Sequence, residues 1–304
     1  MSIRVYISGQ IVEPEFAKVS VFDRGFLFGD SVYETVGTVR GRLFALQEHL
    51  DRLERSAARV ALALPPRETI EAAVRSTVRA AENADARVRI VVTRGIGRSG
   101  DLDPHAATEA QLIVIVQPLN PPAPHLYEEG VGVEVVSVTR NHPGALDPAV
   151  KSGNYLTNVL ALGEARTRRP GVHEAILCSP EGFIAEGATS NVFAVIDDVL
   201  VTPALSVGIL PGITREKVLA LARAENLPWR ETTFSPDDFR RASEAFITSA
   251  ARGILPVCRI DGQNLGSVCP GPLTRQLMVA YAALLDRELA NEPVATSPLA
   301  ESHA

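Results

Sequence analysis

The pattern of hydrophobic and polar positions predicts a chain of many short strands with fewer, longer amphipathic helices. Residues 3–8 alternate between apolar and polar side chains, which is typical of a strand with one face in a core. Short runs bounded by turn residues predict strands at 3–8, 31–39, 86–93, 111–117, 131–139, 174–178, 190–196, 199–202, 244–248 and 255–259. Strands therefore occur in both halves of the chain.

A spacing of three and four residues between apolar side chains predicts the helices. One helical face after residue 45 carries Leu46, Leu50, Leu53, Ala57 and Val60. Further helices are predicted at 67–82, 155–168, 214–225 and 272–290. Because the helices cluster instead of alternating strictly with strands, the pattern favours an α+β fold over a doubly wound sheet.

A proline-rich stretch, LNPPAPHLYEEG, interrupts this pattern and indicates a domain boundary. We predict a small N-terminal α+β domain over 1–118, an interdomain linker over 119–130 and a large domain over 131–290. Residues 291–304 are small, polar and proline-containing, so we expect a disordered tail there.

Composition narrows the class of protein. A hydrophobic content of 46% with 22% charged residues is that of a globular protein. A net charge of −6 without a run of Lys or Arg argues against a nucleic-acid partner. The three cysteines lack metal or redox spacing, so we expect no metal site and a reducing compartment. With neither an apolar signal core nor a membrane-spanning stretch, we expect a cytoplasmic protein without a membrane partner.

Two charged residues in apolar surroundings are the first candidates for chemistry. Lys151 is one of only three lysines, although arginine is abundant, and arginine cannot replace a lysine in imine chemistry. Glu186 lies between apolar residues and a glycine. Both charges are costly to bury without a partner, and pyridoxal phosphate offers an aldehyde to one and a basic ring nitrogen to the other. The alternatives are a surface lysine and an ordinary turn residue.

Two segments and one arginine are candidates for binding the phosphate of such a cofactor. PGITR at 211–215 would present backbone amides at the start of a helix, where an anion is favoured, although many ordinary helices start with proline. Arg52 offers a guanidinium fork, but on spacing alone its neighbours Glu48 and Glu54 favour a solvated helix residue. TSAARG at 248–253 offers small-residue amides and one hydroxyl, or is simply a loop.

Six blocks in a fixed order give these residues a common context. DRGFLFGDSVYE, EHLDRLERSA, KSGNYLTNVLA, EGATSNVF, LPGITR and TSAARGILPV together resemble the class IV, or fold type IV, pyridoxal-phosphate aminotransferases over roughly residues 20–260. The resemblance implies two domains with the cofactor site at their interface, and a homodimer. It also implies small-molecule substrates, namely an amino acid and a 2-oxo acid.

The resemblance implies a role for individual residues. Lys151 corresponds to the catalytic lysine that forms a Schiff base, Glu186 to the acid behind the ring nitrogen, and Tyr155 to the tyrosine near the phenolic oxygen. The positions that correspond to the phosphate site are Arg52, Ile213, Thr214, Ser249 and Ala250. Those that correspond to the substrate pocket are the aromatic residues Phe28 and Tyr33, with Arg40, Arg94 or Arg98 as candidates to meet a second carboxylate.

The chain departs from the family pattern at two places. Ala250 stands where threonine is common, and Arg252 with Gly253 replaces a commonly acidic stretch. The loop RGIGRSGDLDP resembles the RGxGxLGLDP loop of branched-chain enzymes but is one residue longer. DRGFLFGDSVYE, in contrast, is closer to the D-amino acid branch.

The resemblance favours a transaminase that uses a branched-chain L-amino acid and 2-oxoglutarate. A D-amino acid or (R)-amine transaminase is the first alternative, because stereochemistry depends on geometry that sequence does not give. An aminodeoxychorismate lyase would use the same lysine and ring to expel pyruvate. The last alternative is a non-enzymatic phosphate-binding module, which would use the phosphate-binding segments and form no imine.

Overall fold

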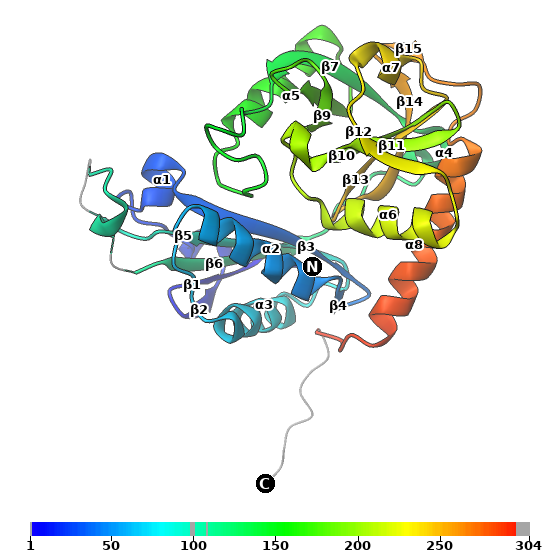
Figure 1. The fold of residues 1–304 in the computed structure, drawn as a ribbon. Coiled ribbons are helices and arrows are strands. Elements are labelled where there is room, and N and C mark those ends of the chain that lie inside the picture. Colours follow the sequence, from blue (N-terminus) through cyan, green and yellow to red (C-terminus); the bar gives the residue numbers. More distant parts are fainter. Residues whose placement is uncertain (1, 98–100, 108, 296–304) are drawn as a thin grey trace. The chain divides into compact units, whose positions relative to one another are not determined.

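The computed structural model describes residues 2–97, 101–107 and 109–295 (Figure 1). The chain forms two compact units, and each is considered by itself. The first unit comprises residues 1–120, 150–154 and 285–304, and the second comprises residues 121–149 and 155–284.

The first unit is built on a six-stranded antiparallel sheet with the order β2-β1-β6-β5-β3-β4. Its strands are β1 (Arg4–Ile7), β2 (Gln10–Val12), β3 (Ser31–Val39), β4 (Arg42–Leu43), β5 (Ala86–Thr93) and β6 (Gln111–Pro118). Helices α2 (Leu46–Arg59) and α3 (Arg67–Ala81) cover one face of this sheet (Figure 1). Their apolar side chains share one core with Val32, Val36 and Ile90 of the sheet.

The predicted apolar stripe of α2 is confirmed for four of its five residues. Leu46, Leu50, Leu53 and Ala57 are all buried in this core, as their three- and four-residue spacing requires. Val60 follows the last residue of the helix and is half-buried against the same core. Alternation along β3 turns Val32, Glu34 and Val36 to the same face of the sheet. A carboxylate therefore lies among core positions, beneath the helices.

A short segment far along the chain, residues 150–154, belongs to the first unit. The Tyr33 N–H donates to the Lys151 carbonyl at 2.9 Å, and the Gly153 N–H donates to the Ser31 carbonyl at 2.9 Å. The segment thus extends the sheet beside β3. Backbone pairing fixes the position of Lys151 in this unit.

The second unit holds a nine-stranded mixed sheet with the order β12-β11-β10-β13-β14-β7-β8-β9, and β15 pairs with β14. The strands are β7 (Val131–Thr139), β8 (Glu174–Cys178), β9 (Ile184–Gly187), β10 (Asn191–Ile196), β11 (Val199–Pro203), β12 (Trp229–Thr232), β13 (Glu244–Ser249), β14 (Gly253–Ile260) and β15 (Gln263–Asn264). Its helices are α4 (His125–Glu129), α5 (Leu156–Arg168), α6 (Ile213–Ala224) and α7 (Pro236–Arg240), and α8 (Pro272–Ala290) continues into the first unit.

Strand pairing brings two turns to the same end of this sheet. Strands β10 and β13 are antiparallel, with Asn191 opposite Thr248. The turn that precedes β10, residues 187–190, therefore lies at the same end as residues 249–252, which join β13 to β14. The N-terminus of α6 lies beside them, because a side chain on Gly212 would overlap the Asn191 amide oxygen.

The predicted helices and strands are present with ends shifted by at most two residues, for example α3 at Arg67–Ala81 and α6 at Ile213–Ala224. Sequence patterns missed the short elements, among them α1 (Arg24–Phe28), α4, α7, β2, β4, β12 and β15, because too few residues carry a period. Three 3-10 turns are also present in the described part of the chain, at Pro14–Phe16, Pro104–Ala106 and Leu205–Val207.

Two further expectations concern the C-terminal end and the membrane. Of the tail expected over 291–304, residues 296–304 lie outside the described residues, whereas Ala295 is buried and its N–H donates to the Gly41 carbonyl at 2.8 Å. Among the helices that the structure describes, none combines the length and the apolar character needed to cross a membrane.

Candidate active site

The Lys151 side chain lies against an aromatic ring in the first unit. Its Nζ is 4.6 Å from the centroid of the Tyr33 ring, and Tyr33 is only 4% exposed. The Lys151 N–H donates to Ser56 Oγ of α2 at 3.1 Å, so both backbone polar groups of this residue have partners within the unit. The predicted lysine and one predicted pocket aromatic are thus brought together.

An arginine that sequence reasoning missed approaches the same ring. The Arg89 guanidinium carbon lies 4.0 Å from the centroid of the Tyr33 ring, within cation–π distance. Arg89 is on β5, whose register with β3 sets it opposite Thr35 and diagonal to Tyr33. Arginines at 87, 89 and 94 crowd this part of the sequence, and only the strand register distinguishes Arg89 from the others.

Arg52 is buried, so the solvated position that its sequence neighbours suggested is wrong. Its Nε donates to Glu34 Oε1 at 2.6 Å and its Nη2 donates to Glu34 Oε2 at 2.8 Å, a bidentate pair. His49 Nδ1 lies 2.7 Å from the same Oε2, and all three residues are at most 5% exposed. The predicted phosphate-binding arginine is therefore held in one orientation by Glu34.

Neither Glu34 nor His49 was predicted, although the sequence carries a signal for both. Glu34 stands at a core-facing position of a strand, where an isolated carboxylate is costly. His49 precedes Arg52 by three residues on the helix, so both side chains lie on neighbouring parts of its surface. A carboxylate at a core-facing strand position, followed along the chain by two basic side chains on one face of a helix, indicates a buried network of hydrogen bonds and ion pairs.

The network shifts the pKa of both its acidic and its basic members. Burial would raise the pKa of the Glu34 carboxyl, but the Arg52 guanidinium and His49 outweigh burial and hold this pKa well below its usual range. Burial lowers the pKa of His49, and this effect exceeds the opposing influence of Glu34, while Arg52 and Lys151 lower it further. Glu34 is therefore ionised and His49 neutral at pH 7.

In the second unit, Glu186 is a buried carboxylate with several donors around it. Its Oε2 accepts the Leu210 N–H at 3.0 Å and lies 3.5 Å from the Asn191 amide nitrogen. Its Oε1 lies 2.5 Å from Arg140 Nε, an ion pair whose N–H is not directed at the oxygen as a hydrogen bond requires. Glu186 is 4% exposed, as expected for an acid that faces a buried partner.

The phosphate segments of the second unit have features that suit an anion. Gly212 is the N-cap residue of helix α6 and provides no side-chain cap for the first amides of the helix, and Thr214 is buried there. The Thr248 hydroxyl is buried without a hydrogen-bond partner among the described residues. Ser249 and Ala250 follow it and are half-buried. Donors therefore gather where the two turns and the helix meet.

The predicted aromatic residues other than Tyr33 are half-buried. Tyr155 precedes the first residue of α5. Phe28 ends α1, and the Arg24 guanidinium lies 5.2 Å from the centroid of its ring.

The three arginine candidates for a second carboxylate have other surroundings. Arg94 Nε donates to Asp30 at 2.7 Å, and its terminal nitrogens donate to two backbone carbonyls. Arg40 lies on an exposed turn and pairs with Asp286, whereas Arg98 lies outside the described residues. Arg40 and Arg94 thus already have carboxylate partners, and the structure adds Arg89 as a fourth candidate.

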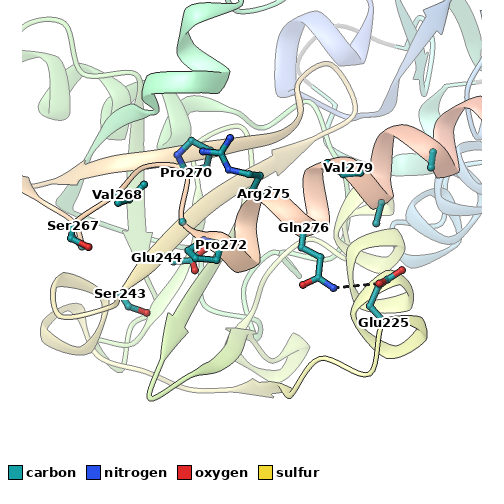
Figure 2. A pocket seen from close by; sticks show the side chains of 14 residues that line it. Glu225, Ser243, Glu244, Ser267, Val268, Pro270, Pro272, Arg275, Gln276 and Val279 are labelled. Atoms are coloured by element: carbon teal, nitrogen blue, oxygen red, sulfur yellow. Dashed lines mark hydrogen bonds between the residues drawn. The ribbon is translucent and has the colours of Figure 1, made fainter.

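A separate surface pocket of about 1060 Å³ opens on the second unit (Figure 2). It is lined by the start of β13, the loop 266–272 and the first turns of α8, and Gln276 Nε2 donates to Glu225 at 3.3 Å across its rim. Glu244, one of the residues that line it, caps α8 by accepting hydrogen bonds from the N–H groups of Leu273 and Thr274. None of the predicted site residues lines this pocket.

Comparison with known proteins places these features in a family. Residues 31–260 match the family model described as amino-transferase class IV. A protein of Methanocaldococcus jannaschii with the name "Putative branched-chain-amino-acid aminotransferase" is 40% identical over 276 residues, which are 90% of this chain and 94% of the relative. A D-alanine aminotransferase of Staphylococcus aureus is 34% identical over 93% of this chain and 98% of its own.

Solved structures give the same result. The branched-chain aminotransferase of Thermoproteus uzoniensis with norvaline superposes with a TM-score of 0.86, at 32% identity, over 95% of this chain and 96% of that chain. A T.th. branched-chain amino acid aminotransferase complexed with N-(5'-phosphopyridoxyl)-L-glutamate superposes with a TM-score of 0.85, at 26% identity, over 97% and 95%. The chain therefore belongs to the class IV aminotransferases, and its mixed α and β architecture is that of fold type IV.

The neutral state of His49 predicts a pH dependence of stability. Its pKa is lower in the folded chain than its value of about 6.5 in the unfolded chain, so the unfolded state binds the proton more readily and the free energy of unfolding falls as pH drops below about 6.5. The slope due to one such group is at most about 1.4 kcal/mol per pH unit. We expect His49→Gln to have a shallower pH dependence than the wild type between about pH 7.5 and 5.5, measured by urea unfolding.

A second histidine with a lowered pKa provides a comparison. Burial and, to a smaller extent, the charge of Arg252 lower the pKa of His173 in the second unit. His173 therefore contributes separately to the pH dependence of the free energy of unfolding, and His173→Gln should remove that contribution. The double variant should be the flattest of the series. A His49→Gln protein with the full wild-type slope would show that His49 is not the neutral, buried base of this network.

Proposed function

We propose that this class IV aminotransferase uses pyridoxal 5'-phosphate to move an amino group between a branched-chain L-amino acid and a 2-oxo acid such as 2-oxoglutarate. The observation that carries the proposal is the position of the Lys151 amine, which lies beside the buried Tyr33 ring that Arg89 also contacts. An amine for the amino-group chemistry and a cation for a carboxylate are thereby held next to one aromatic surface.

The residues of each unit fit the cofactor. The backbone of a lysine is fixed by pairing in the first unit, while a buried carboxylate suited to a ring nitrogen and a set of amide and hydroxyl donors suited to a phosphate lie in the second. The donors would come from Ile213, Thr214, Ser249 and Ala250, and Arg52 would contribute charge. When bound, pyridoxal phosphate supplies an aldehyde that takes up the amino group and a ring that draws electrons from the substrate Cα.

The roles of the chain's own residues follow from their chemistry. Lys151 would hold the aldehyde carbon in the resting enzyme and then carry the proton to and from the substrate Cα as general base and acid. Glu186 would keep a proton on the ring nitrogen by offering it a negative charge. The phosphate donors would fix the ring so that the Cα–H bond stays in line with the amine, which is a contribution of orientation.

The named relatives and the surroundings of Lys151 support the preference for branched-chain substrates. Tyr33 provides an apolar wall for an aliphatic side chain, and Arg89 provides a partner for a carboxylate. The D-alanine aminotransferase relative supports the main alternative, a D-amino acid transaminase. The branched-chain and the D-amino acid transaminase would use the same lysine and cofactor.

We also propose that the enzyme is a homodimer. An apolar stripe of Leu156, Val159 and Leu160 on α5 is 56–70% exposed in the single chain. Neighbouring apolar side chains with this exposure are typical of a surface that a second subunit covers.

Light scattering should give about twice 32.6 kDa for the wild type. Leu160→Glu should shift the protein toward the monomer, whereas Val268→Glu, another exposed site, should not. A monomeric wild type would contradict the proposal.

Replacing the amine tests the cofactor assignment. Lys151→Ala should lose the yellow colour that survives dialysis, should lose the cofactor band fixed by borohydride, and should lose turnover by at least about a thousandfold, because covalent capture and proton transfer both need the amine. Lys217→Ala, which removes another lysine, is the matched control. Unchanged colour, labelling and turnover in Lys151→Ala would exclude the proposed chemistry.

An amine-donor panel tests the substrate. L-Leucine, D-alanine and (R)-1-phenylethylamine would each be offered with pyruvate or with 2-oxoglutarate, and we expect L-leucine with 2-oxoglutarate to react fastest. In the same panel, Arg89→Gln should raise the KM for 2-oxoglutarate about tenfold and the KM for pyruvate by less, since a dicarboxylate gains more from the guanidinium. Reaction of D-alanine alone would establish the D-amino acid alternative, and pyruvate release from aminodeoxychorismate without an acceptor would establish a lyase.

A further inference from the structure

Arg252 ends the turn 249–252, and its side chain contacts four other residues. Its Nε donates to Ser249 Oγ at 3.1 Å within the turn, and its Nη2 donates to the Thr189 carbonyl at 3.2 Å and to the Thr189 hydroxyl. Both terminal nitrogens also lie 3.4 Å from Glu174 Oε2, and Nη1 lies 3.3 Å from His173 Nε2. The Arg252 side chain is only 16% exposed.

The carboxylate at the centre of these contacts belongs to a strand. Glu174 begins β8 and is 1% exposed. The same Oε2 that faces Arg252 accepts the Thr189 hydroxyl at 2.5 Å and the Ser190 hydroxyl at 3.1 Å. Because an unpaired buried carboxylate is costly, Glu174 fixes whatever donates to it. The turn 187–190 and Arg252 are therefore tied to one oxygen atom.

The two turns joined in this way are attached to different parts of the proposed cofactor site. The turn 187–190 directly follows Glu186, the proposed partner of the ring nitrogen. The turn 249–252 contains Ser249 and Ala250, the proposed phosphate donors.

Backbone pairing between the strands stops short of both turns. Figure 1 shows β10 and β13 side by side, and their pairing sets Asn191 opposite Thr248 at this end of the sheet. The tips of the turns lie beyond this pair, so their relative position depends on side chains.

We propose that Arg252 is a positioning residue that, through Glu174 and Thr189, fixes the separation between the ring-nitrogen acid and the phosphate-binding turn. A rigid cofactor with a ring nitrogen at one side and a phosphate at the other binds best when this separation is preset, because less ordering is then needed on binding. Arg252 acts by holding Ser249 and Thr189 in place. The inference rests on the proposed function.

Substitutions can separate the effect of the positive charge of Arg252 from the effect of its several guanidinium nitrogens. A lysine retains one positive charge near Glu174 but cannot reach Ser249, Thr189 and Glu174 simultaneously, because it has a single nitrogen. Glutamine retains a donor but loses the charge. Arg252→Lys should therefore fall between the wild type and Arg252→Gln in any property that depends on the spacing of the turns.

The test is a titration of the apoprotein with pyridoxal 5'-phosphate, followed by absorbance, with thermal unfolding of each apoprotein to show that it is folded. Arg252→Gln should raise the Kd for the cofactor about tenfold, the loss expected when one charge-assisted hydrogen bond no longer orders the site. Arg169→Gln, which breaks another arginine–carboxylate contact of this unit, with Glu134 at 2.9 Å, is the control and should leave the Kd unchanged.

The outcomes separate this inference from the proposed function. A wild-type apoprotein that binds no pyridoxal phosphate would overturn the proposed function, whatever the variants do. A wild type that binds it, with Arg252→Gln and Arg252→Lys at the wild-type Kd, would overturn the role of Arg252 alone. If Arg252→Gln fails to fold, Thr189→Val removes one contact of the same link and should raise the Kd by a smaller factor, and an unchanged Kd in that variant would also overturn the inference.

Discussion

A carboxylate shielded from water must have a cation or several donors close by, and this constraint recurs at each element of the site. Glu34 is completely buried and is paired with Arg52 in two hydrogen bonds. Glu186 lies against Arg140, and Glu174 lies against Arg252. Removing one member of such a pair leaves a buried charge, which costs far more than the pair contributes in net stability.

These pairs determine geometry more than they determine stability. A buried ion pair gains little over a well-packed apolar pair, but its directional hydrogen bonds allow few alternative arrangements. In the first unit the Glu34 pair orients the Arg52 fork beneath α2, while backbone pairing to β3 fixes Lys151. In the second unit, acceptors on Glu186 and Glu174 order the residues that precede α6 and the turns at one end of the sheet.

An enzyme of this class needs such rigidity. The proposed chemistry requires that an amine, an acid and a set of phosphate donors keep fixed positions while a proton moves at the substrate Cα. Substrate preference then depends on a small number of side chains near the amine. Tyr33 and Arg89 are the proposed substrate-binding pair, and the contact between an apolar ring and a guanidinium would suit substrates that are aliphatic in one half-reaction and acidic in the other.

The sequence by itself determined the longer elements and the family, and only the tertiary structure decided which charged residues meet. Periodicity over eight or more residues reports which face is buried, so α2, β3 and α6 were predicted within a residue or two, and ordered motifs were sufficient to predict the family. The sequence neighbours of Arg52 alone favoured a solvated helix residue, because its buried partner Glu34 is on a strand before the helix. Arg89 and Arg94 look alike in sequence, yet strand register sets only Arg89 beside Tyr33. Hydrophobic period is a local property of the chain, whereas the pairing of buried charges depends on contacts that folding alone creates.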